Sequence, residues 1–420
     1  MDALRIQGGK LLEGTVEISG AKNACLPILA ATVLTHKDCQ LNNVPDLVDV
    51  KTMVKLIESL GAEAYYEDKT IRISHKAMSS HEAPYELVRT MRASALVLGP
   101  LLSRFGRARV SLPGGCAIGN RPLDQHLKGL EKLGAEIEIT HGYIDAKANR
   151  LVGGEIIFDF PTVGGTENLL LAASLAKGES VLRNCACEPE IEDLADCLTK
   201  MGVEISGAGT KTIHIQGKDE LDGFEHQVIP DRIEFGTFLI AGALIGKDMT
   251  IKGGLRRHQL PLCAKLEEAN IQIESNEEDG TIRVEQAEEI APLDIQTAPY
   301  PGFPTDMQAQ MMTLLSLANG TSMITETIFE NRFMHTPELN RLGADIRIKG
   351  REAAVHGVSE LSGTTVMATD LRASASLVLA GLVADGTTTI RRIYHLDRGY
   401  AHIENKLKAL GANIERFKEE

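Results

Sequence analysis

A cysteine lies in a segment whose composition excludes regular secondary structure. Residues 111–122 read SLPGGCAIGNRP, with Pro113, Gly114 and Gly115 directly before Cys116. Proline and glycine interrupt helices and strands, so this stretch is predicted to be a loop. A thiol in an accessible loop near positive charge can react, whereas an inert thiol usually packs in a core. Cys116 is therefore a candidate reactive residue, and the alternative is a passive small apolar side chain.

Several cationic side chains occupy the predicted ends of elements. Two matching stretches, TMRASALVLG and DLRASASLVLAG, each place an arginine just before an apolar run. These arginines either pair with a carboxylate such as Asp370 or bind an anion. Lys22, in ISGAKNACLP, is either a solvated lysine or an anion clamp that acts with the free N–H groups of its helix. Together the cations indicate a ligand with several negative charges. They are Lys22, Arg92, Arg121, Arg332, Arg372 and Arg398.

One aspartate stands where a helix is predicted to begin. Asp306 follows Pro304 and Thr305 in YPGFPTDMQAQMM. Helix capping alone explains an aspartate at such a position. The alternative is a general base that takes a proton from a substrate.

The remaining cysteines and the absent motifs limit the chemistry. Seven cysteines, an odd number, are interpreted as free thiols, because they form no disulfide framework. Cys25, Cys39 and Cys263 are interpreted as core residues. For Cys185, Cys187 and Cys197 a metal site is the alternative, although no histidine is close and the spacing matches no standard zinc pattern. The motifs G-x-x-x-x-G-K-[ST], H-E-x-x-H and G-x-S-x-G are absent, so nucleotide hydrolysis, zinc hydrolysis and serine-hydrolase chemistry lack support.

Composition narrows the class of protein further. The 420 residues have a formal net charge of −14, no tryptophan and 4% aromatic residues. This charge and this composition argue against nucleic-acid and anionic-membrane partners. The N-terminus has no apolar signal segment, and no run of about 18 apolar residues occurs. A cytoplasmic protein is expected.

The phrase LGA, or a relative of it, recurs along the chain. The steps between successive copies are 73, 68, 68, 73 and 68 residues. A regular period of this size indicates a repeated structural unit. In each copy an apolar helix is predicted to end at the central residue of the phrase, and an alternating, β-rich stretch follows. These central residues are Gly61, Gly134, Gly202, Asn270, Gly343 and Gly411.

A second helix, apolar nearly all round, precedes each copy, for example in residues 86–102 and 370–386. Helices that are apolar on every side are buried. The fold class is therefore predicted as α/β, with two inside-out domains of three βαβαββ units each, helices inside and sheets outside. The first domain is expected over residues 22–229. Residues 1–21, which contain a strand pair, are expected to join residues 230–420 in a discontinuous second domain, and a cleft between two such domains is the default ligand site.

Six longer stretches resemble one family. They are SGAKNA, LPGGCAIGNRP, FPTDMQAQ, TETIFENRFMH, ATDLRASASLVLAG and IYHLDRGYAHIENKLKALGA. These stretches are similar to the UDP-N-acetylglucosamine 1-carboxyvinyltransferases, the enolpyruvyl transferases of bacterial cell-wall (peptidoglycan) synthesis. The resemblance covers essentially the whole chain. It implies transfer of the enolpyruvyl group of phosphoenolpyruvate to the 3′-hydroxyl of UDP-N-acetylglucosamine, without cofactor or metal, by a cytoplasmic monomer.

The resemblance also implies roles for individual residues. Cys116 matches the general acid that protonates the methylene carbon of phosphoenolpyruvate, and this thiol is the expected target of the epoxide fosfomycin. Asp306 matches the general base. Lys22, Arg121 and Arg398 match the groups that hold phosphoenolpyruvate. The other implied substrate-binding residues are Asn23, Arg92, Pro122, Leu123, Asp124, Gln125, Thr162, Val163, Gly164, Ile328, Arg332, Asp370 and Arg372.

One departure and two alternatives accompany this interpretation. Phe160 and Pro161 occupy the second nucleotide-binding stretch, where many relatives carry a lysine, so a positive charge is absent there. The nearest alternative is the sister enzyme 5-enolpyruvylshikimate-3-phosphate synthase, which lacks the PGGC loop. The other alternative is a catalytically silent sugar-nucleotide sensor, against which Lys22, Cys116 and Asp306 argue.

Overall fold

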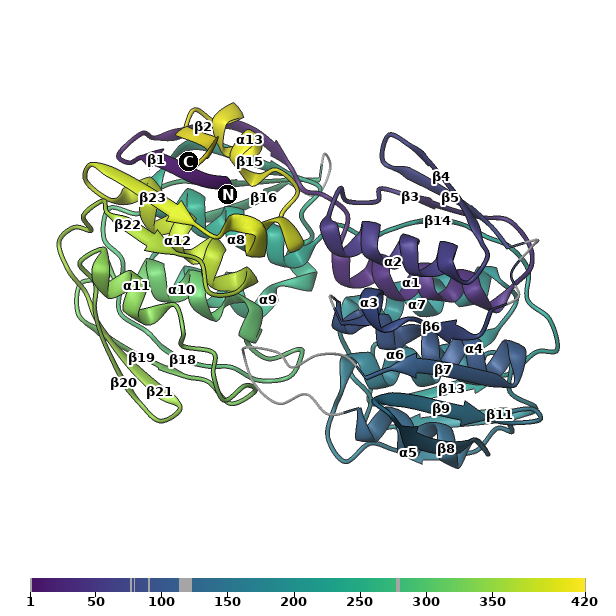
Figure 1. Cartoon of the computed structure of the whole chain (residues 1–420). Coiled ribbons are helices and arrows are strands. Elements are labelled where there is room, and N and C mark those ends of the chain that lie inside the picture. Colours follow the sequence, from purple (N-terminus) through teal and green to yellow (C-terminus); the bar gives the residue numbers. More distant parts are fainter. Residues whose placement is uncertain are drawn as a thin grey trace. The chain divides into compact units, whose positions relative to one another are not determined.

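The computed structural model of the chain describes residues 2–75, 78, 80–89, 91–112, 123–276 and 280–419. The described chain divides into two compact units. We call residues 20–112 and 123–229 the inserted unit. Residues 2–19 and 230–419 form the terminal unit, which carries both ends of the chain (Figure 1).

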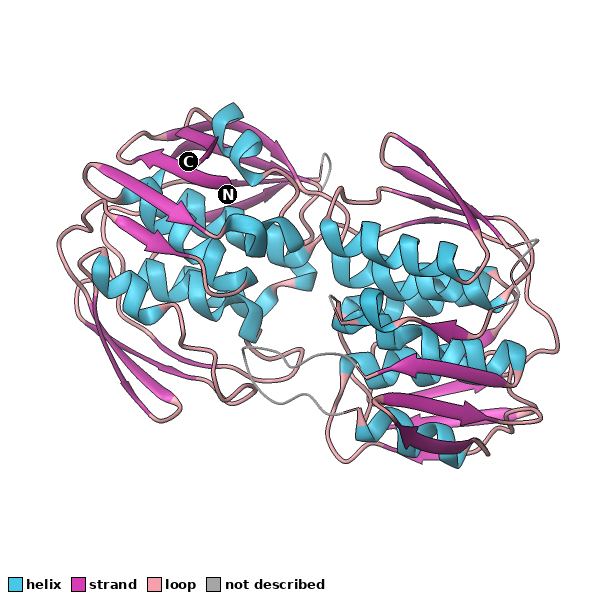
Figure 2. Cartoon of the chain, viewed as in Figure 1, coloured by secondary structure: helices cyan, strands magenta, loops and turns pink. Residues whose placement is uncertain are grey.

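Each unit contains three four-stranded sheets among its described residues. In every sheet the first two strands of a repeat are parallel, and the last two join them in antiparallel pairing with the order first, second, fourth, third. In four repeats a helix follows each of the two parallel strands along the chain, as a parallel connection requires. In the other two the first strand and the first helix come from distant parts of the chain. The strands lie on the outside of each unit and the helices lie between them (Figure 2). The predicted α/β fold with buried helices, outer sheets and six βαβαββ repeats is confirmed.

The inserted unit holds the first three repeats. Repeat 1 comprises β14 (Glu225–Gln227), α1 (Lys22–Ala31), β3 (Cys39–Asn42), α2 (Val48–Ser59), β4 (Glu63–Glu67) and β5 (Thr70–Ser74), with a 3₁₀ turn, η1 (Thr32–Leu34), after α1. Repeat 2 comprises β6 (Glu82–Ala83), α3 (Tyr85–Val88), η2 (Arg92–Val97), α4 (Leu98–Phe105), β7 (Arg107–Ser111), α5 (Asp124–Lys132), β8 (Glu136–Thr140) and β9 (Tyr143–Lys147). Repeat 3 comprises β10 (Glu155–Ile157), α6 (Val163–Ala173), β11 (Glu179–Arg183), α7 (Pro189–Lys200), β12 (Glu204–Ser206) and β13 (Thr212–Gln216).

The terminal unit holds the other three repeats. Repeat 4 comprises β2 (Leu12–Glu17), α8 (Arg232–Ile245), β15 (Gly246–Lys252), η3 (Arg256–His258), α9 (Leu260–Glu268), β16 (Ile273–Asn276) and β17 (Thr281–Val284). Repeat 5 comprises β18 (Asp294–Gln296), η4 (Thr305–Met307), α10 (Gln308–Leu315), β19 (Thr321–Thr325), α11 (Thr336–Arg341), β20 (Asp345–Lys349) and β21 (Glu352–His356). Repeat 6 comprises β22 (Thr365–Met367), α12 (Leu371–Val383), β23 (Thr387–Arg391), η5 (Ile393–Arg398), α13 (Ile403–Ala409), β24 (Asn413–Lys418) and β1 (Asp2–Gln7).

The two N-terminal strands complete two different repeats. β1 lies between β23 and β24, whereas β2 pairs in parallel with β15 of another sheet. They pair with strands of the C-terminal half but not with each other, so the expectation of a strand pair is wrong in that detail. The reason is that one repeat lacks its last strand and another lacks its first, and each gap takes one strand.

The recurring LGA phrase marks a left-handed residue after the second helix of each repeat. The five glycines Gly61, Gly134, Gly202, Gly343 and Gly411 have φ between 95° and 103°, and Asn270 has φ 70°. Such backbone favours glycine because it has no Cβ, and asparagine is among the few other residues that tolerate it. The copy of the phrase at Asn270 has no glycine, and it forms the same turn with a different residue.

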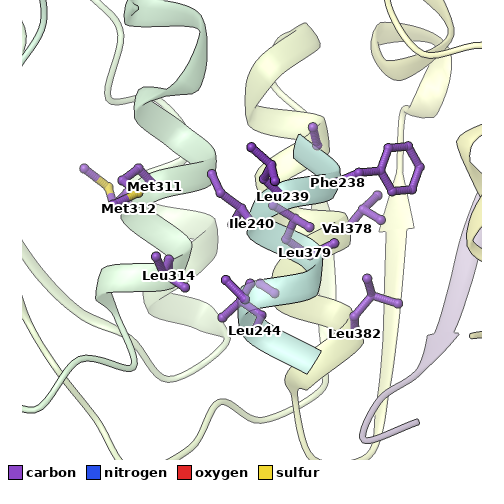
Figure 3. Packing of buried hydrophobic residues seen from close by; sticks show 14 of the residues in the cluster. Phe238, Leu239, Ile240, Leu244, Met311, Met312, Leu314, Val378, Leu379 and Leu382 are labelled. Carbon is purple, nitrogen blue, oxygen red and sulfur yellow. The ribbon is translucent and has the colours of Figure 1, made fainter. Parts of the chain in front are cut away.

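The first helices of the repeats form the cores. In the terminal unit α8, α10 and α12 pack through Phe238, Leu239, Ile240, Leu244, Met311, Met312, Leu314, Val378, Leu379 and Leu382 (Figure 3).

The single helix expected over residues 86–102 is wrong, because the chain there forms α3, η2 and α4 in succession. No helix among the described residues is both long enough and apolar enough to cross a membrane.

The left-handed turns predict a position-specific cost of alanine. A Cβ at Gly202 would meet no atom within 4 Å, so Gly202→Ala tests backbone strain alone. We expect it to lower the free energy of unfolding by about 1–2 kcal/mol. Gly154→Ala in the same unit is the matched control, because Gly154 does not have positive φ and its Cβ would make only an ordinary contact at 3.7 Å. Equal effects of the two changes in chemical denaturation would contradict the interpretation.

Candidate active site

A carboxylate shared by two buried arginines is the centre of the candidate site in the terminal unit. Asp306 Oδ1 accepts a hydrogen bond of 2.6 Å from Nη2 of Arg332, and its Oδ2 accepts one of 3.3 Å from Nη2 of Arg372. The arginine side chains are 4% and 5% exposed, and that of Asp306 is 28% exposed. Asp306 lies in η4 without capping it, so helix capping does not explain this residue.

The two guanidiniums keep Asp306 ionised. Burial alone would raise the pKa of Asp306, but the charges of Arg372, Arg332 and Arg232 outweigh it and hold that pKa well below its usual range. Burial would likewise lower the pKa of Arg372, but the Asp306 carboxylate raises it. Arg372 therefore stays charged, and Asp306 is a carboxylate at neutral pH.

Arg372 has N–H donors that Asp306 does not use. Its Nε and Nη1 are buried without an acceptor in hydrogen-bond geometry among the described residues, and Tyr400 is a further neighbour that raises the pKa of Arg372. Its guanidinium lies 5.5 Å from the centre of the Tyr400 ring. Asp370 does not pair with it through the side chain, because its Oδ1 caps α12 by accepting from the backbone N–H groups of Arg372 and Ala373. The expected pairing of Arg372 with a carboxylate is thus met by Asp306.

A second cationic position lies at the end of η5. Arg398 is the last residue of this turn. Burial lowers the pKa of the nearby His395, and the charges of Arg392 and Arg398 lower it further, whereas the charge of Asp370 raises it. The preceding Asp397 is held by Arg416 of β24 through both guanidinium Nη atoms, with 3.2 Å between Nη1 and Oδ2. The turn that carries Arg398 is therefore fixed to the sheet.

In the inserted unit Lys22 is buried and paired. It begins α1, and its Nζ lies 3.2 Å from Oδ2 of Asp49 at the start of α2. Asn23 follows it, and Pro27 has no N–H to donate to the Asn23 carbonyl one turn earlier. The interpretation of Lys22 as a solvated lysine is wrong, because the second helix of the same repeat supplies a carboxylate.

The two predicted nucleotide-binding stretches lie together. Gln125 of α5 joins them, because its Oε1 accepts from the N–H of Asp159 at 2.7 Å and its Nε2 donates to the carbonyl of Phe160 at 3.3 Å. Thr162 caps α6 by accepting from the N–H of Gly165. Leu123 and Asp124 are at the start of α5, while Val163 and Gly164 are at the start of α6.

A buried histidine lies beneath this pair of helix ends. Nδ1 of His126 accepts from Nδ2 of Asn168 at 3.1 Å, since the amide nitrogen can only donate. A Cβ on Gly164 would lie 3.4 Å from Cε1 and 3.6 Å from Nε2 of this ring. Burial, helped by the charge of Arg92, lowers the pKa of His126 to about 4. His126 is therefore neutral, with its second ring nitrogen as the donor.

Comparison with known proteins identifies the family. A family model described as EPSP synthase (3-phosphoshikimate 1-carboxyvinyltransferase) matches residues 6–407. A protein of Anaeromyxobacter sp. (strain K) named UDP-N-acetylglucosamine 1-carboxyvinyltransferase is 57% identical over 423 residues, and the match covers 100% of both chains. One of the same name from Geotalea daltonii is 56% identical over 419 residues, again covering 100% of both. The chain belongs to the enolpyruvyl transferase family.

Solved structures agree with this assignment. The enolpyruvyl transferase NikO from Streptomyces tendae matches with a TM-score of 0.90 and 28% identity, covering 100% of this chain and 99% of that one. EPSP synthase from Acinetobacter baumannii matches with a TM-score of 0.78 and 16% identity over 100% of both chains, which shows the shared fold. The predicted family resemblance is confirmed.

The structure brings only some of the predicted residues of the transferase together. Asp306, Arg332 and Arg372 are in contact, whereas Lys22 and Arg92 belong to the other unit. Cys116, Arg121 and Pro122 lie outside the described residues. Within the described ranges no group of three or more His, Cys, Asp or Glu side chains could hold a metal ion. Cys185, Cys187 and Cys197 are buried free cysteines there, so the alternative of a metal site at this group is wrong.

Sequence reasoning missed four polar residues that support the site, namely Asp49, His126, Asn168 and Glu326. None belongs to a chemical motif, and each is recognised by what it touches. A signal was nevertheless present for three of them, because Asp49, His126 and Glu326 lie where a strand of a repeat passes into a helix, as the predicted residues do. Alignment of the six repeats with one another would have drawn attention to these positions.

The neutral His126 predicts how stability depends on pH. Its pKa is about 4 in the folded transferase and about 6.5 when unfolded, so the unfolded chain takes up the proton first. The stability that this residue contributes is complete above pH 6.5 and is lost as the pH falls toward 4. We expect the destabilisation caused by His126→Gln to shrink by about 2 kcal/mol between pH 7 and pH 5. Denaturation of both proteins at the two pH values measures it, and a constant difference would contradict the assignment.

Proposed function

We propose that the chain transfers the enolpyruvyl group of phosphoenolpyruvate to the 3′-hydroxyl of UDP-N-acetylglucosamine and releases phosphate. This is the first committed step of peptidoglycan synthesis. Full-length identity of 57% to a relative of that name supports the choice of substrates. The observation that carries the chemistry is the ionised Asp306 held by two buried arginines, one of which has unused donors. We further propose that the enzyme works as a monomer in the bacterial cytoplasm without cofactor or metal.

The reaction needs an acid and a base. In the proposed mechanism Cys116 gives its thiol proton to the methylene carbon of phosphoenolpyruvate, while Asp306 takes the proton of the sugar hydroxyl as its oxygen bonds to the neighbouring carbon. The resulting tetrahedral intermediate carries both phosphate and carboxylate. Loss of phosphate and of one methyl proton then restores the double bond in the enol ether.

The cations are assigned to the anionic groups of the substrates. Lys22, Arg121 and Arg398 would hold phosphoenolpyruvate, with Asn23 beside them. The other proposed substrate-binding residues are Arg92, Arg332, Asp370 and Arg372. The starts of α5 and α6 would hold the uridine diphosphate through Pro122, Leu123, Asp124, Gln125, Thr162, Val163 and Gly164, and Ile328 would contact the sugar. Cationic side chains that the fold already holds in position stabilise the negative charge of the intermediate, because they do not have to rearrange during the reaction.

The strength of the base depends on the ligand. Clamped by Arg332 and Arg372, Asp306 is ionised but is a weak base, because its pKa lies far below neutral. An anionic substrate group bound to Nε and Nη1 of Arg372 would compete for the guanidinium charge and raise the pKa of Asp306. The site would then strengthen its base only when substrate is bound.

Phosphate release from phosphoenolpyruvate tests the reaction and its acid together. We expect release that depends on UDP-N-acetylglucosamine and does not occur with shikimate 3-phosphate as acceptor. Cys116→Ala should lower kcat by about 10²–10⁴-fold, since the general acid is lost. Cys187→Ala, which removes a buried thiol, should retain wild-type kcat within about twofold. Undiminished turnover of Cys116→Ala would rule out the thiol as the acid, and release with shikimate 3-phosphate would favour the sister enzyme.

The same variants carry a second readout. A thiolate at Cys116 should open the epoxide ring of fosfomycin and form one covalent adduct. Mass spectrometry should find that adduct in wild type and in Cys187→Ala but not in Cys116→Ala.

Asp306→Asn tests the proposed base. Asparagine has the same shape but cannot take the proton, so kcat should fall by about 10²–10⁴-fold. Two buried guanidiniums also lose their carboxylate, so the unfolding temperature should fall as well. Asp294→Asn, an exposed position in the same unit, is the control for loss of a carboxylate. Turnover of Asp306→Asn close to that of the control, measured well below the unfolding temperature, would contradict the role.

A further inference from the structure

A buried carboxylate next to the candidate site has no role in the proposed reaction. Glu326 directly follows β19 and is 1% exposed. Its Oε1 accepts from the N–H groups of Ile328 at 2.8 Å and Phe329 at 3.2 Å, and from the hydroxyl of Thr297 at 2.9 Å. Its Oε2 accepts from the hydroxyl of Thr305 at 2.8 Å. These four bonds come from backbone and hydroxyl groups, and together they satisfy the buried oxygens of this side chain.

These contacts join the two segments that carry the base and the expected sugar contact. Thr305 begins η4 and is bonded covalently to Asp306, while Ile328 lies in the loop after β19. The same loop supplies Arg332, which binds Asp306 at 2.6 Å and lies 5.4 Å from the centre of the Phe329 ring. The contacts thus close a ring from Glu326 through Thr305, Asp306, Arg332 and Phe329 back to Glu326. Such a ring restricts where the Asp306 carboxylate can point.

Comparison among the repeats shows that the fold itself does not require this glutamate. The residue at the same place, directly after the second strand, is left-handed in four other repeats, with φ values of 58°, 58°, 80° and 59°. They are Asn43, Asn184, Gly253 and Arg392. The side chains of Asn43 and Asn184 donate to the backbone carbonyls of Val228 and Phe158, which follow the first strands of their repeats.

In repeat 5 a neighbour has taken over that structural task. The hydroxyl of Thr327 donates at 2.6 Å to the carbonyl of Thr297, which follows β18 as Val228 follows β14 and Phe158 follows β10. Glu326 therefore does not have to bond the Thr297 carbonyl. One of its oxygens accepts from the Thr297 hydroxyl, and the other accepts from the hydroxyl of Thr305.

We propose that Glu326 is a positioning residue of the transferase, whose buried carboxylate fixes the Asp306 turn and the Ile328 loop in one arrangement. This inference rests on the proposed function, because it takes Asp306 as the base. Misplacement of a reacting group by about 1 Å can cost about 10²-fold in rate. Glu326 acts through Thr305 and the loop and does not itself touch the reacting atoms.

Substitutions at Glu326 separate its shape from its charge. In Glu326→Gln the remaining carbonyl oxygen can keep its three donors, and the new NH₂ group can donate to the Thr305 hydroxyl, which then accepts. We expect kcat within about threefold of wild type for this variant. Glu326→Ala loses all four bonds, so kcat should fall by about 10²-fold and KM for UDP-N-acetylglucosamine should rise.

Substitutions at Thr305 test the link to the base alone and keep the proposal testable if Glu326→Ala does not fold. Thr305→Val removes the hydroxyl at nearly constant shape and should lower kcat by about tenfold while KM for UDP-N-acetylglucosamine changes little. Thr305→Ser restores the hydroxyl and should restore kcat. Thr313→Val is the matched control, because it removes another buried hydroxyl of the same unit, bonded at 3.1 Å to the Ser376 carbonyl, and should keep kcat.

Two results would overturn the proposal. One is that Thr305→Val and Glu326→Ala both have the same kcat as the control Thr313→Val. The other is failure of Thr305→Ser to restore turnover. A wild-type protein that releases no phosphate would instead contradict the proposed function. Hydrogen exchange then tests whether Glu326 holds the Ile328 loop in place. The amides of Ile328 and Phe329 should lose protection in Glu326→Ala and keep it in Glu326→Gln.

Discussion

The proposed chemistry of the terminal unit depends on one carboxylate that two buried guanidiniums share. Arg332 and Arg372 are almost fully buried, and burying a charge is costly unless it is paired. Asp306 pairs with both, so one carboxylate accepts hydrogen bonds from two guanidiniums. The positive charges of these arginines hold the pKa of Asp306 well below its usual range and keep it ionised. Removing one partner of such a cluster typically costs about 3–5 kcal/mol, so the chemistry and the fold depend on the same contacts.

The repeat architecture explains why the candidate residues gather where they do. The first two strands of each repeat are parallel, so their carboxyl ends lie at the same edge of the sheet, where the helices begin. Ligand sites of α/β proteins are found at this carboxyl edge. Lys22 and Gly164 lie at the starts of first helices, Asp306 lies in the turn just before one, and Gln125 and Arg332 lie in or before second helices. Each repeat thus offers two helix ends for polar residues, while its core helices stay apolar.

The sequence predicted most of the fold and only part of the site, for physical reasons. A left-handed turn after a helix has a strong residue preference, so five glycines and Asn270 marked the repeats. Buried helices were recognisable because they are apolar all round, but the sequence did not indicate that one of them is divided into α3, η2 and α4. The sequence gives even less indication of which polar side chains pair with one another. Asp49 for Lys22 and Asn168 for His126 come from other helices of the inserted unit, so only the folded chain shows the pairing.

Glu326 and Asp306 together show how a repeated scaffold acquires a specific site. The fold needs only a hydrogen bond that joins the ends of the first two strands of a repeat, and an asparagine side chain donates this bond in two repeats. In repeat 5 a threonine does it, and the position before it becomes available for a carboxylate. Because that carboxylate is satisfied by neutral donors, it adds rigidity without competing for the arginines that Asp306 needs. Two acidic residues in one repeat thus differ in environment. One is held by cations and is the proposed base, and the other is held by hydroxyl and backbone N–H groups and is proposed to fix the first in place.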